Sequence, residues 1–531
     1  MQEVISIQNA LISVSNKTGI TDFARSLTQL GIQLISTGKT SELLHDNQVA
    51  SCTVTEITGF PEIMDGRVKT LHPKIHAGIL GLRDKHADVA KQYHIAWLDL
   101  VIVNLYPFAE TIKKPGVTLS EAIEKIDVGG PTMIRAAAKN FAWVVVVVDP
   151  QDYSLILDEL QTYQGIRLAT RRYLAVKAFT HTAAYDATIS AYLQQDVIVR
   201  NAVLRSDNLA VADPSHAFPS QLTLSLEKHA ELRYGENPQQ RACAYRISST
   251  TSGLLSAIQH QGKPLSYNNL VDADAAWNCV REFAQPACVI VKHANPCGAA
   301  ESSDISHAFT LALHADAVSA FGGIVALNRP CTQAVAEQMA QIFMEVIIAP
   351  SYDAAALSIL AAKPNLRVLA VPVYTPVTYE MKYIEGAVLV QGKDTAMLTE
   401  TDLQVVTRVK PSQQQLMAML FAWRVLKHMK SNAILIANAH VTVGVGVGQV
   451  SRVDAVELAI RKMQASSEQA SELILASDAF FPFRDSIDKI APTGIPAIIQ
   501  SGGSMRDAEV IAACDEYGLA MVLTGKRCFR H

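Results

Sequence analysis

An ammonium group and an imidazole stand side by side at Lys292 and His293, directly after the apolar run 287–291. The run predicts a buried strand, and the Asn-Pro and glycine that follow it predict a turn. A histidine takes up a proton near neutral pH, and a neighbouring lysine stabilises developing negative charge. Because α/β proteins place reactive groups in loops at strand ends, the pair is a candidate catalytic centre. This segment alone leaves a structural Lys-His pair at a surface turn as the alternative.

Two polar loops near the N-terminus also follow predicted strands, one over residues 13–19 and one over residues 36–40. The Gly-Lys-Thr of the second loop is not part of a Walker loop, since the required earlier glycine is replaced by Gln33. Hydroxyls and backbone N–H groups after a strand can nevertheless cradle a phosphate monoester. Ordinary turn and N-cap residues are the competing interpretation for either loop.

Further cations, hydroxyls and one acid in the same half would suit an anionic substrate. His72 and His76 have the spacing of half a metal site, but Pro73 lies between them and no acidic partner is placed as in a zinc-protease helix. No metal site is therefore predicted there. The residues that remain candidates are Arg67, Lys69, Thr70, Tyr106, Asp127 and Lys139.

The second half of the chain carries its own candidate binding segments. Arg233 and Tyr234 stand beside a turn, and the glycines at 322–323 permit close approach of the backbone to a ligand. The segment 477–485 sets an aromatic wall between carboxylates, which could hold a flat heterocycle, although core packing is the commoner use of Phe. The Val-Gly alternation of 442–448 fails the dinucleotide-binding pattern, so a Rossmann cofactor site is not predicted.

The elements that must position these side chains alternate between strands and helices. Strands are predicted over residues 10–14, 32–35, 100–103 and 143–148, with a helix over 20–30 after the first. This alternation indicates a parallel sheet covered on both faces. A long helix around residues 170–193 closes the region, and the polar segment 206–220 is the predicted linker to a second α/β region, large enough for two lobes. No short internal repeat is visible.

Composition narrows the class of protein. Of 531 residues, 49% are apolar and 18% are charged, which is typical of a globular protein. The net charge of −4 gives no electrostatic argument for binding nucleic acid or a membrane surface. The N-terminus shows no secretory signal, and no apolar run reaches the roughly 18 residues of a membrane span. Eight scattered cysteines without a C-x-x-C pair predict a reducing, cytoplasmic location.

Taken together, the motifs resemble the bifunctional AICAR formyltransferase / IMP cyclohydrolase family of purine biosynthesis, in the family's order and over essentially the whole chain. Ser-Val-Ser-x-Lys-Thr-Gly, Gly-Arg-Val-Lys-Thr-Leu-His-Pro, Asn-Leu-Tyr-Pro-Phe and Arg-Ala-Ala-Ala-Lys-Asn are similar to its cyclohydrolase half. Leu-Arg-Tyr-Gly-Glu-Asn-Pro, Lys-His-Ala-Asn-Pro-Cys-Gly and Ser-Asp-Ala-Phe-Phe-Pro-Phe-Arg-Asp are similar to its formyltransferase half.

The resemblance implies an α/β fold with a methylglyoxal-synthase-like, parallel-sheet domain over residues 1–199. It implies two cytidine-deaminase-like lobes over residues 200–531. The deaminase zinc signature is absent, because Asn295 stands where that signature needs glutamate and Cys297 has no second cysteine at the required spacing. The lobes are therefore expected to lack zinc.

The family carries out the last two steps of IMP synthesis. By resemblance, a formyl group first moves from 10-formyltetrahydrofolate to the 5-amino group of AICAR. His293 would be the base, and Lys292 would stabilise either the formyl oxyanion or the departing folate nitrogen. The positions that would contact the nucleotide or the folate are Arg233, Tyr234, Arg452, Phe480, Asp485, Arg527 and Phe529.

In the second step, the carboxamide nitrogen of formyl-AICAR attacks the formyl carbon, and loss of water gives IMP. The step is intramolecular, so the protein chiefly holds a cyclisable conformer and stabilises charge. The positions that match the family's catalytic residues are Lys69, Tyr106, Asp127 and Lys139. The positions that match its substrate- and phosphate-binding residues are Ser13, Ser15, Lys17, Thr37, Gly38, Arg67 and Thr70.

Two positions depart from the family pattern. Lys39 replaces the second glycine of a Ser-Thr-Gly-Gly-Thr turn, which adds a cation near the phosphate and predicts strain. Asn438 and Ala439 replace Lys followed by Asn or Asp, so Asn438 is expected to bind substrate from one residue upstream. The resemblance further implies a homodimer with formyltransferase sites at its interface, no catalytic metal, and room for a structural monovalent cation. A regulatory protein that binds phosphate metabolites without turnover is the rival hypothesis, and the cations at both sites argue against it.

Overall fold

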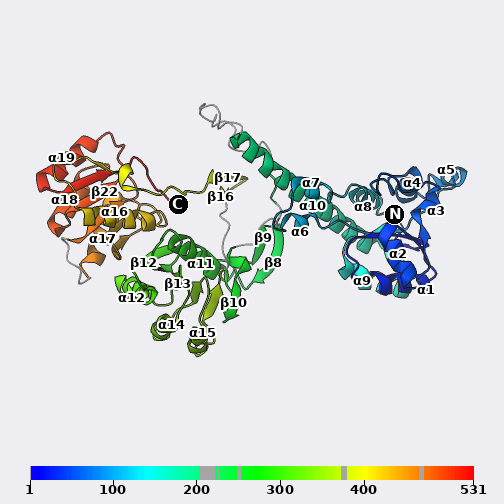
Figure 1. Ribbon diagram of the computed structural model, residues 1–531, viewed down its shortest axis with the longest axis horizontal. Coiled ribbons are helices and arrows are strands. Elements are labelled where there is room, and N and C mark those ends of the chain that lie inside the picture. The colour runs from blue at the N-terminus through cyan, green and yellow to red at the C-terminus, as the bar shows by residue number, and fades with distance from the viewer. Residues whose placement is uncertain (1, 204–221, 225, 248–252, 372–378, 466–471) are drawn as a thin grey trace. The chain divides into compact units, whose positions relative to one another are not determined.

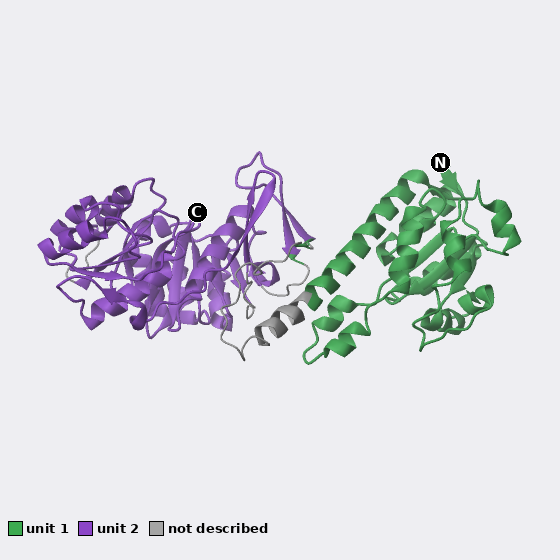
Figure 2. Ribbon diagram, turned by 90° about the horizontal axis from the view of Figure 1, so that it is seen from above, with its two compact units in different colours: residues 1–226, 247–249 green, residues 227–246, 250–531 purple. Residues whose placement is uncertain are grey.

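The computed structural model describes residues 2–203, 222–224, 226–247, 253–371, 379–465 and 472–531, and it divides the chain into two compact units (Figure 2). Unit 1 comprises Met1–Leu226 and Ile247–Ser249, and unit 2 comprises Glu227–Arg246 and Thr250–His531. The predicted linker 206–220 lies outside the described residues. The predicted boundary between residues 199 and 200 falls within helix α10 (Leu168–Val203). As a boundary between functional domains it stays a prediction.

Unit 1 is built on a five-stranded parallel sheet with the order β4-β3-β2-β5-β6. Alternate side chains of the central strand serve opposite faces, since Ile12 belongs to one apolar cluster and Leu11 to the other. Strands buried on both faces need such continuous apolar sequence. The strands are β2 (Asn9–Val14), β3 (Gln33–Ser36), β4 (Cys52–Thr53), β5 (Leu100–Asn104) and β6 (Val145–Val147).

Helices pack around this sheet (Figure 1). Phe23 and Leu27 of α1 belong to the first apolar cluster, and Met133 and Ile134 of α8 belong to the second, so the two helices cover opposite faces. A short pairing of β1 (Val4–Ile5) with β7 (Ile166–Arg167) lies beside the start of α10. The helices before α10 are α1 (Ile20–Gln29), α2 (Gly38–Asp46), α3 (Val54–Thr58), α4 (Pro73–Leu80), α5 (Ala87–Gln92), α6 (Phe108–Ile112), α7 (Leu119–Ile123), α8 (Gly129–Lys139) and α9 (Tyr153–Tyr163).

The strand order of unit 1 contains a switch point at its centre. β2 lies between β3 and β5, so the connections from neighbouring strands leave in opposite directions. At such a point the loops at the carboxyl ends of the strands diverge and leave a crevice for a ligand. The polar loops singled out in the sequence follow β2 and β3, and Tyr106 follows β5. One edge of the sheet therefore carries all three segments.

Unit 2 contains two six-stranded mixed sheets whose strand orders are the same, β10-β15-β14-β13-β11-β12 and β18-β23-β22-β21-β19-β20. Parallel and antiparallel pairings also correspond. The first sheet consists of β10 (Ile258–Gln261), β11 (Ala287–Lys292), β12 (Asn295–Glu301), β13 (Ile324–Leu327), β14 (Val346–Ala349) and β15 (Arg367–Ala370). The second consists of β18 (Gln404–Val405), β19 (Ile434–Ala437), β20 (Thr442–Gly446), β21 (Ile474–Ser477), β22 (Ala497–Gln500) and β23 (Ala520–Leu523).

The helices of the two lobes repeat as well. α11 (Tyr267–Val280) precedes β11 and α16 (Gln413–Leu426) precedes β19, and each begins with a capping box at a serine, Ser266 or Ser412. No repeat is visible in the sequence, because the duplication is kept in topology rather than in residue identity. The other helices are α12 (Ile305–Ala315), α13 (Ala317–Ala320), α14 (Gln333–Met339) and α15 (Ala354–Leu360) in the first lobe, and α17 (Arg452–Met463), α18 (Asp485–Ile490) and α19 (Asp507–Tyr517) in the second.

Corresponding edge strands join the two lobes. Ala300 of β12 pairs with Val441, just before β20, in an antiparallel bridge. Beside this bridge, the N–H of Ala299 donates to Oγ1 of Thr442 at 2.9 Å. Each lobe thus covers an edge strand of the other, which removes an open template for pairing with other chains.

Two further two-stranded pairings lie outside the main sheets of unit 2. One joins β8 (Leu226–Leu232) to β9 (Ala242–Ile247), and the other joins β16 (Tyr379–Ile384) to β17 (Ala387–Gly392). Every side chain of β16 is exposed, including Tyr383 at 70%. An isolated two-stranded hairpin is at best marginally stable in water.

The structure confirms the strands predicted from the apolar runs and the long helix, now bounded as α10. The strain expected at Lys39 is absent, because the positive φ of that turn, 40°, belongs to Gly38. Lys39 is the second residue of α2. Within the described ranges, no helix combines the length and apolar character that crossing a membrane requires.

Candidate functional site

Polar groups at the ends of β2, β3 and β5 contact one another in unit 1. The hydroxyls of Ser13 and Thr37 are 2.9 Å apart, which joins the ends of β2 and β3. The backbone N–H of Ser15 donates to Oδ1 of Asn104 at 2.6 Å, which joins β2 to β5. Hydroxyls and backbone N–H groups therefore meet at the switch point, where a crevice is expected.

Positive charge gathers at the same edge. Nζ of Lys17 donates to Oγ1 of Thr40 at 2.6 Å. Burial lowers the pKa of Lys17, and the positive charges of Lys69 and Lys39 lower it further. Like charges held together in this way are relieved by a bound anion, so the cluster suits a phosphate group.

The segment before α4 brings two more predicted residues to this edge. Nζ of Lys69 lies 3.5 Å from the position that a Cβ would take on Gly38, so its ammonium is beside the N-terminus of α2. Thr70 is buried, and a Cβ on Gly129 would stand only 2.8 Å from its Oγ1. Glycine at 129 is therefore what lets the start of α8 approach this threonine.

Arg67 is held by a carboxylate in this segment. Its guanidinium pairs with Glu124, the residue that follows α7. Both side chains are more than half exposed, so the pair contributes little stability and exchanges easily. Arg67 is thus able to leave Glu124 for a stronger anion.

Asp127 lies immediately before α8 and is the acid of this cluster. Its Oδ1 accepts the N–H of Gly130 at 2.8 Å. Burial raises the pKa of Asp127, while hydrogen bonds from the backbone N–H groups of Gly130 and Tyr106 and the charge of Lys69 oppose the rise. The structure therefore brings Lys69, Asp127 and the backbone of Tyr106 together, with a carboxylate that is more basic than an exposed one.

Lys139 is not part of this group within one copy of the chain. It is the last residue of α8, whereas Asp127 precedes the first. The 11 residues of α8 rise by about 16 Å between them. Lys139 is also exposed. Its predicted catalytic role stays a prediction that this geometry does not explain in a single copy.

In unit 2, Lys292 and His293 lie where β11 turns into β12. The turn has two central residues, His293 and Ala294, with φ of 51° and 59°. Two positive φ values define the hairpin turn that normally demands Asn or Gly. A non-glycine residue in this region costs of order 1–3 kcal/mol and persists only where the surroundings hold it.

The ammonium of Lys292 is held by backbone oxygens. Nζ donates to the carbonyl oxygen of Phe321 at 2.9 Å and to that of Gly322 at 3.0 Å. Gly322 has φ of 67°, and a Cβ there would lie 3.2 Å from Nζ. Two of the three ammonium protons are thereby engaged, which fixes the charge and leaves the third for a ligand.

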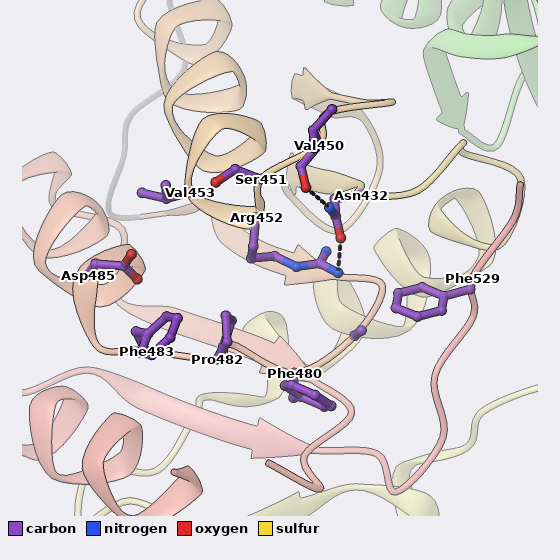
Figure 3. Close-up of a pocket in the computed structure, with 11 residues that line it drawn as sticks. Asn432, Val450, Ser451, Arg452, Val453, Phe480, Pro482, Phe483, Asp485 and Phe529 are labelled. Carbon is purple, nitrogen blue, oxygen red and sulfur yellow. Dashed lines mark hydrogen bonds between the residues drawn. The ribbon is translucent and has the colours of Figure 1, made fainter. Parts of the chain in front are cut away.

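The hairpin is linked to the second lobe next to a cavity. The N–H of Lys430 donates to Oδ1 of Asn295 at 3.0 Å. Two residues further on, Asn432 lines a cavity of about 380 Å³ in the second lobe (Figure 3). The wall also contains four residues predicted from the sequence, Arg452, Phe480, Asp485 and Phe529.

Arg452 is tied into the protein at the back of this cavity. It is 7% exposed and pairs with the fully buried carboxylate of Asp478. Its other terminal nitrogen donates to Oδ1 of Asn432 at 2.7 Å, and Asn432 in turn donates to the carbonyl oxygen of Val450 at 3.0 Å (Figure 3). Arg452 is the first residue of α17, so the free N–H groups of that helix face the same wall.

The remaining predicted residues of unit 2 lie at different distances from this cavity. Arg527 packs over the ring of Phe529, 4.9 Å from its centroid, and so belongs to the cavity's surroundings. Arg233 packs over Tyr234 at 5.3 Å, and neither lines the cavity. Oδ1 of Asn438 accepts the N–H groups of His440 and Val441, so it caps its own turn. Substrate binding by Asn438 stays a prediction.

Several residues that hold these sites were missed in the sequence. Asn104 stands in the same motif as Tyr106, and Asp478 is one of the carboxylates that flank the predicted aromatic wall, but the sequence assigns neither residue a role in holding a site. Asn432 and Asp272, which accepts the N–H of Ala294 at 2.7 Å, carry no local signal, because their partners are distant along the chain.

The described residues contain no group of three or more His, Cys, Asp or Glu side chains arranged to hold a metal ion. All eight cysteines are free thiols. Burial raises the pKa of the Cys297 thiol to about 12, so this residue of the Pro-Cys motif is not a ready thiolate ligand.

Comparison with known proteins identifies the family. Residues 137–462 match the model of the family described as AICARFT/IMPCHase bienzyme, and residues 19–132 match that of the MGS-like domain. The chain is 48% identical to the bifunctional purine biosynthesis protein PurH of Bacillus thuringiensis (strain Al Hakam), over 99% of this chain and 100% of that protein. A solved structure titled "Crystal structure of ForH" is 35% identical, covers 35% of this chain and 98% of its own, and has a TM-score of 0.32. The chain belongs to the AICARFT/IMPCHase bienzyme family.

Proposed function

We propose that the two strand-end clusters divide the two reactions of this family between the two units. The protein is a bifunctional enzyme of purine biosynthesis, and it catalyses the last two steps of IMP synthesis. It transfers a formyl group from a folate cosubstrate to AICAR and then closes the ring of formyl-AICAR. We assign the first step to unit 2, with 10-formyltetrahydrofolate as donor, and the second step to unit 1.

For formyl transfer, the observation that carries the assignment is the Lys292–His293 pair at a strained turn, which is hydrogen-bonded through Asn295 to Lys430, two residues before Asn432 of the second lobe's cavity. The 5-amino group of AICAR is a poor nucleophile, because its lone pair is delocalised into the ring. His293 would take its proton as it attacks the formyl carbon. Lys292, with one free N–H, would stabilise charge on the formyl oxygen or on the departing folate nitrogen.

The cavity of the second lobe would hold the flat part of a substrate. Phe480 and Phe529 supply aromatic walls, and Asp485 adds a carboxylate. Arg527, stacked on Phe529, and Arg233, stacked on Tyr234, would contact the nucleotide. The buried pairing of Arg452 with Asp478 supports a different role for Arg452 than a free phosphate ligand, because it shapes the wall and directs Asn432.

For ring closure, Asp127 would accept a proton from the carboxamide nitrogen as that nitrogen attacks the formyl carbon. The raised pKa of Asp127 supports this role, since it makes the carboxylate a better base. Lys69 would stabilise the developing oxyanion before water leaves, and Tyr106 lies beside the same carboxylate. Lys17, the hydroxyls of Ser13 and Thr37, and the N-terminus of α2 would hold the phosphate.

The assignment is tested by separating the two activities. Purified protein is supplied with AICAR and 10-formyltetrahydrofolate, and the release of tetrahydrofolate is measured. In a separate assay it is supplied with formyl-AICAR alone, and IMP is measured. We expect His293→Ala to remove formyl transfer and leave ring closure intact, and Asp127→Ala to do the reverse. Loss of both activities in either variant would contradict two separate sites, and AICAR binding without turnover in the wild type would favour the regulatory alternative.

We also propose that the protein works as a homodimer. The exposed apolar side chains of the β16–β17 hairpin support this, because such a hairpin needs a partner surface to be stable. The position of Lys139 supports it too. A lysine separated from Asp127 by the length of a rigid helix is able to join the reaction only in the site of a second copy.

Mixing variants tests the dimer and the role of Lys139 together. Lys69→Ala and Lys139→Ala proteins are each expected to be inactive in ring closure. If Lys139 acts in the partner's site, a refolded equal mixture should recover about one quarter of wild-type activity, since half the dimers are mixed and each has one complete site. No recovery, together with a monomeric mass by sedimentation, would contradict the proposal.

We expect a cytoplasmic location from the cysteine pattern.

A further inference from the structure

The turn that carries His293 has an anchor outside its own hairpin. Oδ1 of Asp272, on α11, accepts the backbone N–H of Ala294 at 2.7 Å. Asp272 is half-buried, and α11 packs against β11. A carboxylate that accepts a backbone N–H makes a short and strong hydrogen bond. The N–H that it holds belongs to the second of two residues with positive φ.

The other contacts of the hairpin fix its flanks rather than its tip. Lys292 is held through its own ammonium, and Asn295 is held by the N–H of Lys430. Among the hydrogen bonds of the described residues, the bond to Asp272 is the one that reaches the backbone of His293 and Ala294 from another element. The direction of the imidazole therefore depends on this carboxylate.

The second lobe provides an internal comparison. Its equivalent turn, between β19 and β20, has Ala439 and His440 at the centre, and neither has a positive φ. The turn is capped from within by Asn438. Counting from the matching capping boxes of α11 and α16, the position of Asp272 corresponds to Ala418, which is buried. The lobe without a catalytic pair thus lacks both the strained turn and the anchor.

We propose that Asp272 is a positioning residue for formyl transfer. It holds Ala294 in the left-handed conformation and so aims the His293 imidazole at the amine of the substrate. The proposal rests on the proposed function of His293 as the base. Asp272 itself touches neither substrate nor cosubstrate.

The test compares Asp272→Ala with Asp272→Asn, which keeps an oxygen acceptor, and with Val271→Ala, an exposed neighbour on the same helix. Formyl-transfer kcat and KM, the dissociation constant of AICAR by calorimetry, ring closure of supplied formyl-AICAR and the melting temperature are measured for each. Misplacing a catalytic group by about 1 Å costs up to roughly a hundredfold in rate. We therefore expect Asp272→Ala to lower kcat by about 10- to 100-fold, with AICAR binding and ring closure unchanged.

Asp272→Asn is expected to retain most of the wild-type kcat, since an amide oxygen accepts the same N–H. Should Asp272→Ala fail to give folded protein, Asp272→Ser replaces it, because a serine hydroxyl is too short to reach Ala294. Activity of Asp272→Ala or Asp272→Ser equal to that of Val271→Ala would overturn the anchor, and so would an equal loss in Asp272→Asn.

His293→Ala, assayed in parallel, distinguishes a failure of the proposed base from a failure of the proposed anchor. An active His293→Ala would overturn the proposed base and with it the reason for an anchor. An inactive His293→Ala beside a fully active Asp272→Ala would overturn the anchor alone.

Discussion

A substitution at Gly322 directly tests whether the position of the Lys292 ammonium matters for formyl transfer. It has φ of 67°, and its carbonyl oxygen accepts a hydrogen bond from Nζ of Lys292. A Cβ at this position would lie 3.2 Å from Nζ and 3.3 Å from the ring of Phe343. Gly322→Ala therefore presses directly on a charge that we assign to the transition state.

The expected effect of Gly322→Ala has two parts, a cost in stability and a loss of formyl-transfer rate. An alanine in the left-handed region costs about 1–2 kcal/mol of stability. Gly518, after α19, has φ of 68° with no atom within 4 Å of an added Cβ, so Gly518→Ala carries the same backbone cost without the contact. In Gly322→Ala, Lys292 or Phe343 must also yield by a few tenths of an ångström. We expect this to lower formyl transfer by about tenfold, or about 1.4 kcal/mol in the barrier.

The assay is formyl transfer and ring closure measured side by side, with thermal unfolding followed for both variants. Gly322→Ala should lose formyl-transfer activity relative to Gly518→Ala, while ring closure in unit 1 stays equal in the two proteins. Equal formyl-transfer rates would refute the view that the Gly322 turn sets the position of Lys292. A loss of ring closure would show that the effect is not confined to unit 2.

Three other predictions follow from charged groups. Burial raises the folded-state pKa of Asp127 above its unfolded value, so the folded state holds the proton more tightly. The stability of the folded state therefore falls as the pH rises from the unfolded-state pKa through the folded-state pKa. Asp127→Asn should therefore stabilise unit 1 at neutral pH in a denaturation curve, while it removes ring closure. Asp478→Ala leaves the buried guanidinium of Arg452 unpaired and should cost about 3–5 kcal/mol in urea unfolding, whereas a loss under 1 kcal/mol would contradict a buried pair. Glu124→Gln frees Arg67 from an exposed ion pair, so the KM for formyl-AICAR should fall by up to about fivefold with no change in melting temperature. An unchanged KM would mean that Glu124 does not compete with the substrate for Arg67.

The sequence predicts strands such as β5 and β11, because they are short apolar runs bounded by polar residues, but it does not predict the two mixed sheets of unit 2 strand by strand. It also predicts which loops meet, since the carboxyl ends of parallel strands share one edge. It does not predict the turn at His293 and Ala294, because two non-glycine residues with positive φ violate the usual preference and depend on an anchor 22 residues earlier.

Pairings between distant residues are what the sequence does not show. Arg452 is expected to contact the nucleotide, and nothing near it in the sequence indicates that Asp478, 26 residues later, pairs with its guanidinium. Lys139 and Asp127 are both assigned to catalysis by the resemblance, and because a motif carries no distance, the length of α8 between them is seen only in the structure. The resemblance implies two lobes of one type, but their identical strand orders are not visible in the sequence, because equal strand orders need no equal residues.

The pairing that joins the edge strands β12 and β20 keeps both lobes soluble, because each lobe covers an edge strand of the other. A fragment that ends after residue 371 would keep its catalytic turn but present the outer N–H and C=O groups of β12 to the solvent. Such an edge recruits whatever strand it meets, including another copy of itself. Expression of one lobe alone should thus give aggregated protein. The two lobes therefore have to be made in one chain and fold together.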